Sequence, residues 1–196
     1  MFSQLKYLKS FFLNYKNVLL RAIFYELIYS IKNLEFGSHL VENKNKRATD
    51  TVPCSYYFLH HIAKFINNKK IKNTIDLGSG LGRTVKFLSA NTDSNIMGYE
   101  LNKKMFKRSL KLKNKKIKFF NKNILKLDYR KIQPDCFIMI DPFTDKQDTI
   151  MIQKKIIQSR NFNKKRFYLI TVNIDSKLLN KGFKNLKSIK TGKMGS

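Results

Sequence analysis

The stretch Asp76-Leu77-Gly78-Ser79-Gly80-Leu81-Gly82 decides which fold the sequence predicts. It directly follows a short, mostly apolar run that ends in Thr74-Ile75-Asp76 and is typical of a buried strand. Glycines at alternate positions let the backbone turn tightly and approach a ligand closely. A helix from about Arg83 to Ala90 follows, and its first turn offers free N–H groups. The stretch therefore predicts a strand, a ligand-binding turn and a helix in succession.

The segments that follow continue to alternate between strand and helix patterns. Apolar runs predict strands at Ile96–Glu100, Ile117–Asn121, Cys136–Asp141 and Phe167–Asn173, with helices at Asn102–Lys113 and Asp145–Asn161. The run Cys136–Asp141 is continuously apolar up to its final acid, as expected for a central strand buried on both faces. Phe167–Asn173 is likewise expected to be a buried strand. This alternation predicts an α/β fold with a doubly wound, mainly parallel, Rossmann-like sheet and helices on both faces.

The sequence after Asp175 is short for a complete fold of this class. Gly182-Phe183 and Leu186–Ile189 supply enough apolar residues for one further strand but hardly for a full hairpin. We therefore expect the C-terminal strands of the fold to be truncated.

The N-terminal part of the chain is predicted to be helical. Apolar residues between Leu5 and Ile31 recur at helical spacing, and Ser55–Ile66 predicts a further helix. The polar connector Glu42–Asp50 lies between them. We therefore divide the chain into residues 1–45, an N-terminal helical extension with its connector, and residues 46–196, the main domain.

The helical extension has two interpretations. In the first, it forms one or two helices that pack on the main domain. In the second, residues 1–33 lie on an anionic membrane surface, which their basic and aromatic residues contact. Its richest apolar run, Val18–Ile31, is interrupted by Arg21 and Glu26. A spanning helix needs about 20 mostly apolar residues, so the extension is not predicted to cross a membrane.

An acid at the end of the second predicted strand indicates what kind of ligand the glycine turn binds. Glu100 lies 20 residues after Gly80, where an acid in a doubly wound fold reaches the two hydroxyls of a ribose. The dinucleotide fingerprint GxGxxG needs a glycine where this chain has Arg83. The spacing is instead GxGxG, with Asp76 two residues before the first glycine. A carboxylate there suits a cationic ligand with an ammonium or sulfonium group.

The residues DLGSGLG at 76–82 and GYE at 98–100 resemble motif I and the ribose acid of class I S-adenosylmethionine-dependent methyltransferases. The resemblance covers about residues 51–173 and implies S-adenosylmethionine as the cofactor. It implies cofactor contacts from the turn residues Asp76, Leu77, Gly78, Ser79, Gly80 and Gly82, from Glu100 at the ribose, and from Leu101, Asn123 and Ile124 around the adenine. Asn123 stands where the family has an acid, and its amide keeps an acceptor oxygen for the adenine amine.

Asp141-Pro142-Phe143 ends the fourth predicted strand, where this fold places its reacting centre. The tripeptide is similar to the [DN]PP[YF] motif of enzymes that methylate amines on bases or on glutamine, with one proline missing. That likeness implies that Asp141 and the next carbonyl accept hydrogen bonds from the target amine and that the Phe143 ring stacks on it. Small bacterial methyltransferases with Asn-Pro-Phe at this place are an alternative match.

A third likeness points to a protein acceptor. Thr51-Val52-Pro53-Cys54, the glycine turn and Gly98-Tyr99-Glu100-Leu101-Asn102 together resemble the lysine methyltransferases that modify the c subunit of ATP synthase. Members of that group carry an apolar N-terminal segment that associates with membrane. The sequence departs from that family at Asp141, where the family has no such acid.

The chain carries a large excess of positive charge. Its 40 Lys and Arg residues against 13 Asp and Glu residues give a net charge of +27, which attracts polyanions such as nucleic acid or an anionic membrane. Abundant Lys, Asn, Ile, Phe and Tyr are also what A+T-rich codons favour, and the lysines form no motif with interleaved aromatics. We therefore interpret the charge mostly as background, with a weak preference for an anionic partner.

The remaining composition narrows the class of protein. With 42% hydrophobic and 13% aromatic residues, the chain can form a packed core, which excludes wholesale disorder. Cys54 and Cys136 form no CxxC pair, and the three histidines have no ligand at metal spacing, so we predict no metal site and a reducing, cytoplasmic location.

The sequence thus predicts a methyltransferase that acts on an amine of a macromolecule, either a protein lysine or a nucleic acid. The alternatives are a non-catalytic, basic α/β domain that binds RNA and a membrane-surface protein whose N-terminal helix is its main working part. The oligomeric state is left open.

Overall fold

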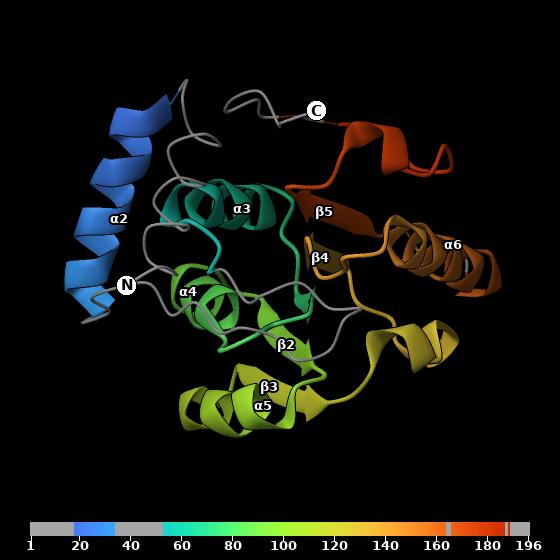
Figure 1. Cartoon of the computed structure of the whole chain (residues 1–196), viewed down its shortest axis with the longest axis horizontal. Helices are drawn as coiled ribbons and strands as arrows, with labels where there is room; N and C mark the ends of the chain where they lie inside the picture. The colour runs from blue at the N-terminus through green and yellow to red at the C-terminus, as the bar shows by residue number, and fades with distance from the viewer. Residues whose placement is uncertain (1–17, 34–52, 164–165, 187, 189–196) are drawn as a thin grey trace.

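Figure 1 shows the computed structural model, which describes residues 18–33, 53–163, 166–186 and 188; for residues 33 and 160–163 only the backbone is described. The strands are β1 (Asn73–Leu77), β2 (Asn95–Glu100), β3 (Ile117–Asn121), β4 (Cys136–Ile140) and β5 (Tyr168–Val172). The α-helices are α2 (Leu19–Asn33), α3 (Tyr56–Asn68), α4 (Arg83–Asn91), α5 (Lys103–Ser109) and α6 (Lys146–Asn163). Short 3₁₀ helices are η2 (Leu110–Leu112), η3 (Ile124–Lys126), η4 (Tyr129–Lys131) and η5 (Ser176–Leu178).

The five strands form one parallel sheet in the spatial order β3-β2-β1-β4-β5. The strand order reverses at β1, which is the arrangement of a doubly wound, Rossmann-like fold. Helices cover both faces of the sheet (Figure 1). The predicted fold class is therefore confirmed, and the carboxyl end of β1 is where such a fold places a ligand.

Two hydrophobic clusters lie on opposite faces of the sheet. One includes Leu59 of α3 and Val85 of α4, and the other includes Ile152 of α6. Side chains of β4 alternate between them: Ile138 belongs to the first cluster and Phe137 to the second. The prediction that this strand is buried on both faces is confirmed, because helices cover it from both sides.

Polar caps explain where two of the helices begin. The Ser55 side chain accepts the Tyr57 N–H at 3.2 Å and caps α3. The Asn102 side chain accepts the N–H groups of Lys104 and Met105 at 3.0 and 3.3 Å and caps α5. Both are the polar N-cap residues that such helix starts prefer. The single helix expected at 102–113 is divided into α5 and η2.

Two expectations near the C-terminus were wrong. β5 was expected to be a buried strand, but its first four residues are only half-buried, because it is the edge strand of the sheet. Gly182-Phe183 forms no strand: the Gly182 N–H donates to the Asn180 side chain and the Phe183 N–H to the Asn180 carbonyl. The backbone groups that a strand would need are used in this turn. The expected strand at Leu186–Ile189 lies partly outside the described residues.

The helix α2 packs on α3, as the first of the two interpretations predicts. Ala22 is fully buried, and the Tyr29 ring stacks on Tyr56 with centroids 5.3 Å apart. The side of α2 away from the domain exposes large apolar residues: Leu20, Phe24, Leu27, Ile28 and Ile31. Among the described helices, none combines the length and apolar character that crossing a bilayer requires. Residues 1–17 and the proposed boundary at 45–46 lie outside the described residues.

Candidate functional site

The glycine turn after β1 is tied to the end of β2 by backbone hydrogen bonds. The N–H groups of Gly78 and Ser79 both donate to the Tyr99 carbonyl, at 3.0 and 2.9 Å. Gly78 has a φ of 91°, and Gly82, immediately before α4, has a φ of 90°. Both values lie in the left-handed region that favours glycine. The backbone therefore leaves β1 in a tight turn whose conformation depends on these residues.

Glu100, the predicted ribose-binding acid, reaches the same turn from the end of β2. Its Oε2 accepts the Gly80 N–H at 2.8 Å, and its Oε1 accepts the Asn102 N–H at 2.7 Å. Burial raises the pKa of Glu100, and these backbone N–H groups oppose the rise. A carboxylate oxygen has more than one lone pair, so both oxygens can still accept a hydrogen bond from a ligand hydroxyl.

Asp76 and Ser79 place buried polar atoms without partners in this turn. Asp76 is 1% exposed, and within the described residues neither its Oδ1 nor the Ser79 Oγ has a hydrogen-bond partner. Burial, together with the charge of Glu100, raises the pKa of Asp76 to about 7. Because buried polar atoms in native proteins almost always have a partner, these two atoms indicate a place where a polar or cationic ligand would supply one.

Asp141-Pro142-Phe143 follows β4 and contacts the glycine turn. A Cβ placed on Gly78 would lie 3.0 Å from the Pro142 Cβ, so the two sequence motifs meet here. Asp141 has a φ of 37°, which is uncommon for a residue with a side chain. Its side chain is exposed, yet the surrounding protein removes enough water to raise the pKa of its carboxyl group. Strand pairing brings Asp141, Asp76 and Glu100 to the same end of the sheet.

Two of the expected site residues are part of the core. Phe143 is 9% exposed and lies in the cluster between the sheet and α6, as does Leu77. The expected stacking of the Phe143 ring on a target amine requires an accessible ring, and this packing does not favour it. Leu77 can contact a ligand through its backbone.

The residues expected around the adenine lie at the ends of β2 and β3. Leu101 is exposed, Asn123 is half-buried and Ile124 is buried. The Asn121 side chain joins the two strand ends by donating to the carbonyls of Glu100 and Leu101, at 2.8 and 3.0 Å. The Asn123 Oδ1 already accepts the N–H two residues later, at 2.9 Å. Its role toward the adenine stays a prediction.

The structure adds a group at the start of α4 that the sequence did not reveal. The Arg83 guanidinium lies 3.3 Å from the Glu26 carboxylate of α2 and 4.6 Å from the centre of the Tyr56 ring. The other Glu26 oxygen accepts the Tyr56 N–H at 2.7 Å. Glu26 thereby joins α2 to the first turns of α3 and α4, directly after Gly82. In the sequence, Glu26 stands out only as an acid that interrupts an apolar run.

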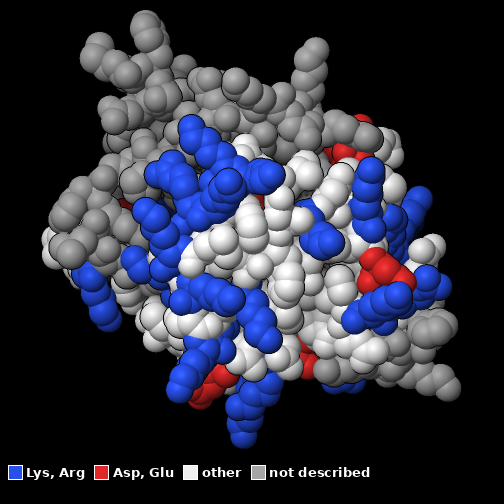
Figure 2. All heavy atoms as spheres, turned by 90° about the horizontal axis from the view of Figure 1, so that it is seen from below, with Lys and Arg blue, Asp and Glu red and all other residues white. Residues whose placement is uncertain are grey.

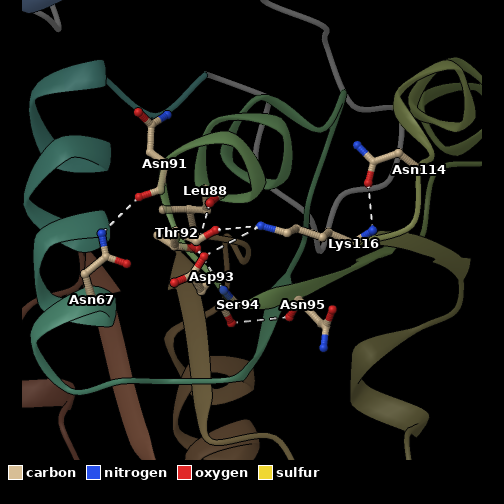
Figure 3. Close-up of polar contacts among 9 residues, drawn as sticks. All are labelled: Asn67, Leu88, Asn91, Thr92, Asp93, Ser94, Asn95, Asn114 and Lys116. Carbon is tan, nitrogen blue, oxygen red and sulfur yellow. Dashed lines mark hydrogen bonds and ion pairs between the residues drawn. The ribbon is translucent and has the colours of Figure 1, made fainter.

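A hollow of about 360 Å³ lies at the opposite, amino end of the sheet, between the ends of α3 and α4. Figure 3 shows that its polar groups bind one another: the Asn67 side chain donates to the Asn91 carbonyl at 3.0 Å, and Thr92 donates to the Leu88 carbonyl at 2.7 Å. The Lys116 Nζ donates to the Thr92 carbonyl at 3.3 Å. These contacts hold the end of α4 in place.

The described ranges contain no group of three or more His, Cys, Asp and Glu side chains that could hold a metal ion. Both cysteines, Cys54 and Cys136, are buried, and burial raises the pKa of each thiol. A buried neutral thiol is a poor nucleophile, so neither cysteine is a candidate for the chemistry of the site.

No protein-family model matches the chain, and no curated protein sequence is similar to it. Several solved structures are similar in fold. One is the methyltransferase domain of bacterial CtHen1, with 18% identity and a TM-score of 0.46, covering 52% of this chain and 58% of that chain.

Two further similar structures come from named bacteria. An RNA methyltransferase from Salinibacter ruber in complex with S-adenosyl-L-homocysteine has 14% identity and a TM-score of 0.46, covering 55% of this chain and 71% of that one. The N-methyltransferase NodS from Bradyrhizobium japonicum has 10% identity and a TM-score of 0.41, and the match covers 53% of this chain and 61% of the NodS chain. The chain thus spans less than two thirds of the CtHen1 and NodS structures.

Proposed function

We propose that the chain is a methyltransferase that binds S-adenosylmethionine in the turn after β1 and transfers its methyl group to an amine of a macromolecule. The observation that carries the proposal is the pair of acids at this turn. Asp76 is buried, and its Oδ1 has no partner among the residues that the structure describes; Glu100 contacts the same turn through Gly80. A site with this arrangement can take a ligand that is both cationic and ribose-bearing.

The turn fits this cofactor for physical reasons. S-adenosylmethionine has an ammonium group, a sulfonium group and a ribose with two hydroxyls. Positive charge beside Asp76 would favour its ionised form and offset the cost of burial, and Glu100 would accept from the ribose hydroxyls. The glycines, among them Gly78, let the backbone approach the ligand. Leu101, Asn123 and Ile124 stay our candidates for the adenine.

The chain's own residues would orient the acceptor. S-adenosylmethionine supplies an electrophilic methyl group when bound, and the protein must place the acceptor nitrogen in line with it. Asp141 would accept a hydrogen bond from the amine and take up the proton that the amine loses, which its raised pKa favours. Pro142 contacts the Gly78 region of the turn and so would hold Asp141 close to the cofactor.

The acceptor is proposed to be a protein lysine or an amine of a nucleic acid. The likeness to c-subunit lysine methyltransferases favours a protein, and the motif at Asp141 favours a planar amine. A cytoplasmic location suits either acceptor. Transfer of a radiolabelled methyl group from S-adenosylmethionine into separated protein, RNA and lipid fractions of a cell extract identifies which one is used.

Calorimetry with S-adenosylhomocysteine tests the cofactor assignment. Wild type is expected to bind, and Glu100→Ala is expected to bind about 10- to 100-fold more weakly, because a hydrogen bond to a charged group contributes about 1.5–3 kcal/mol. Asp128→Ala, which removes a half-buried acid paired with Arg130, is the matched control and should bind like wild type. A wild-type protein that is folded and does not bind would refute the proposal.

The exposed side of α2 favours a second candidate function at a membrane surface. Its apolar residues, described above, lie on the side away from α3, and Arg21 and Lys32 beside them are exposed. Such a helix can lie in a lipid interface. Sedimentation with anionic liposomes, with and without residues 1–33, tests this function, and equal binding by the two forms would exclude it.

A further inference from the structure

Residues 101–127 are the most basic part of the chain. This segment of 27 residues contains 11 Lys and Arg residues and no Asp or Glu, against 40 Lys and Arg residues in the 196-residue chain. The eleven are Lys103, Lys104, Lys107, Arg108, Lys111, Lys113, Lys115, Lys116, Lys118, Lys122 and Lys126, and all are exposed. A uniform codon bias would spread lysines evenly, whereas here their density is about twice the chain average.

The fold places these cations on one side of the molecule. The segment forms α5, η2 and β3, and β3 is the edge strand against which α5 packs. Figure 2 views the molecule from the side on which α5 and β3 lie in Figure 1, and Lys and Arg side chains gather over it with few acids between them. We call this surface, defined by the eleven cations, the α5–β3 face.

The cations of the α5–β3 face are hardly neutralised by the protein. Within the described part of the chain, Lys116 alone among them has an ion pair, at 3.9 Å from the exposed Asp93. Lysines on an edge strand also prevent pairing with other chains, which accounts for Lys118 on β3. It does not account for the cations of α5, a helix. Their mutual repulsion favours binding of an external polyanion.

The α5–β3 face borders the glycine turn. α5 begins three residues after Glu100, and the Lys122 N–H donates to the Glu100 carbonyl at 3.2 Å. Lys104 and Lys107 have the i, i+3 spacing that places side chains next to each other on a helix, and Lys111 follows in η2, directly after α5. A polyanion bound along α5 would therefore reach the end of β2, where the proposed site lies.

We propose that the α5–β3 face binds the phosphate backbone of a nucleic acid. A membrane is the less suitable polyanion, because Leu101 and Leu110 are the only large apolar residues of this segment that are well exposed. The exposed apolar residues gather instead on α2, which packs on α3. The proposal deepens the proposed function by favouring a nucleic acid as the macromolecule, but binding is measured without cofactor and stands apart from methyl transfer.

Fluorescence anisotropy with a labelled 20-nucleotide RNA tests the proposal on the full chain. The test variant is Lys104→Gln/Lys107→Gln/Lys111→Gln. The matched control removes three exposed lysines outside the α5–β3 face: Lys146→Gln/Lys154→Gln/Lys177→Gln. Both variants lose the same charge, and circular dichroism checks that both are folded.

The two variants should differ in salt dependence. The slope of log affinity against log salt should fall by about 2 in the test variant, since each contact between a lysine and a single-stranded phosphate contributes about 0.7. Affinity at about 0.1 M salt should fall at least about tenfold in the test variant and less than about threefold in the control. A DNA strand of the same sequence should show a similar slope, because the phosphates carry the charge.

Three results would overturn the proposal. Equal losses in the two variants would show that only net charge matters. Binding of the wild type to vesicles containing anionic lipid, without binding to RNA or DNA, would assign the face to membranes. Absence of nucleic-acid binding at low salt would remove the face as an interface. None of these results affects the titration with S-adenosylhomocysteine, so failure here is distinguishable from failure of the cofactor assignment.

Discussion

Polar side chains at the two ends of the sheet differ in whether they have hydrogen-bond partners. At the carboxyl end, Asp76 is 1% exposed and its Oδ1 has no partner among the described residues. At the amino end, the side chains of Asn67, Thr92 and Lys116 each donate a hydrogen bond to a backbone carbonyl. The hollow between the ends of α3 and α4 lies at the amino end, so it is not where the unpartnered groups are.

This contrast separates two uses of polar residues. Polar groups that bind one another at a helix end stabilise the local fold and leave little for a ligand. Buried polar atoms without partners cost folding free energy, of the order of 1–3 kcal/mol each, and such costs persist where a ligand or a reaction uses the group. We therefore place function at the carboxyl end, and substitutions at the two ends should have different consequences.

The largest effect is expected for Asp141→Ala. If Asp141 takes up the proton of the acceptor amine, methyl transfer should fall about 100-fold or more, whereas affinity for S-adenosylhomocysteine should stay within about threefold. Single-turnover transfer and calorimetry measure the two quantities. Undiminished transfer would show that Asp141 only forms the turn after β4.

The next largest effect is expected for Gly78→Ala. The new Cβ would lie 3.0 Å from the Pro142 Cβ at a φ of 91°, and such a conformation costs about 1–3 kcal/mol. Affinity for S-adenosylhomocysteine should fall about tenfold or more. Gly182→Ala is the control: its Cβ would meet the side-chain ends of Ile157 and Asn180, far along the chain from the glycine turn, and should leave binding unchanged. Equal behaviour of the two variants would contradict a ligand-binding turn.

The charge state of Asp76 predicts an effect of pH. Its pKa is raised to about 7, so the native protein keeps a proton that the unfolded chain loses near pH 4. The free energy of unfolding should therefore fall as pH rises from about 4 to 7. Binding of cationic S-adenosylmethionine needs the carboxylate, so affinity should rise about tenfold between about pH 6 and pH 8.

Asp76→Asn separates this effect from other titrations. Denaturant unfolding at about pH 8 should show a more stable protein, by a few kcal/mol, because each unit of pKa shift corresponds to about 1.4 kcal/mol. Calorimetry should show weaker binding with little pH dependence between about pH 6 and 8. A variant with the pH profile of the wild type would show that another group titrates.

The smallest effect is expected at the amino end. Thr92→Ala removes the hydroxyl that donates to Leu88 and accepts the Ser94 N–H. The variant should lose about 1 kcal/mol of unfolding free energy and keep wild-type affinity for S-adenosylhomocysteine. A thermal melt measures the loss of stability, and a calorimetric titration measures the affinity. A tenfold loss of affinity would mean that the two ends are not independent.

Much of the fold and of the candidate site could be predicted from the sequence, because these features depend on neighbours along the chain. Apolar runs and polar caps such as Ser55 indicate strands and helix starts through local hydrogen bonds and side-chain spacing. The glycine turn with Asp76, and the distance to Glu100, likewise require only the succession of strand, turn and helix. These features specified the fold class and the cofactor hypothesis without coordinates.

What the sequence could not show depends on segments that are distant along the chain. Contact of Pro142 with Gly78, the link from Glu26 to Arg83 and burial of the Phe143 ring arise from packing between elements. The same holds for the α5–β3 face, since a count of lysines does not reveal which share a surface. Sequence patterns report local periodicity, whereas burial, pKa and surface charge depend on which distant residues the fold brings together.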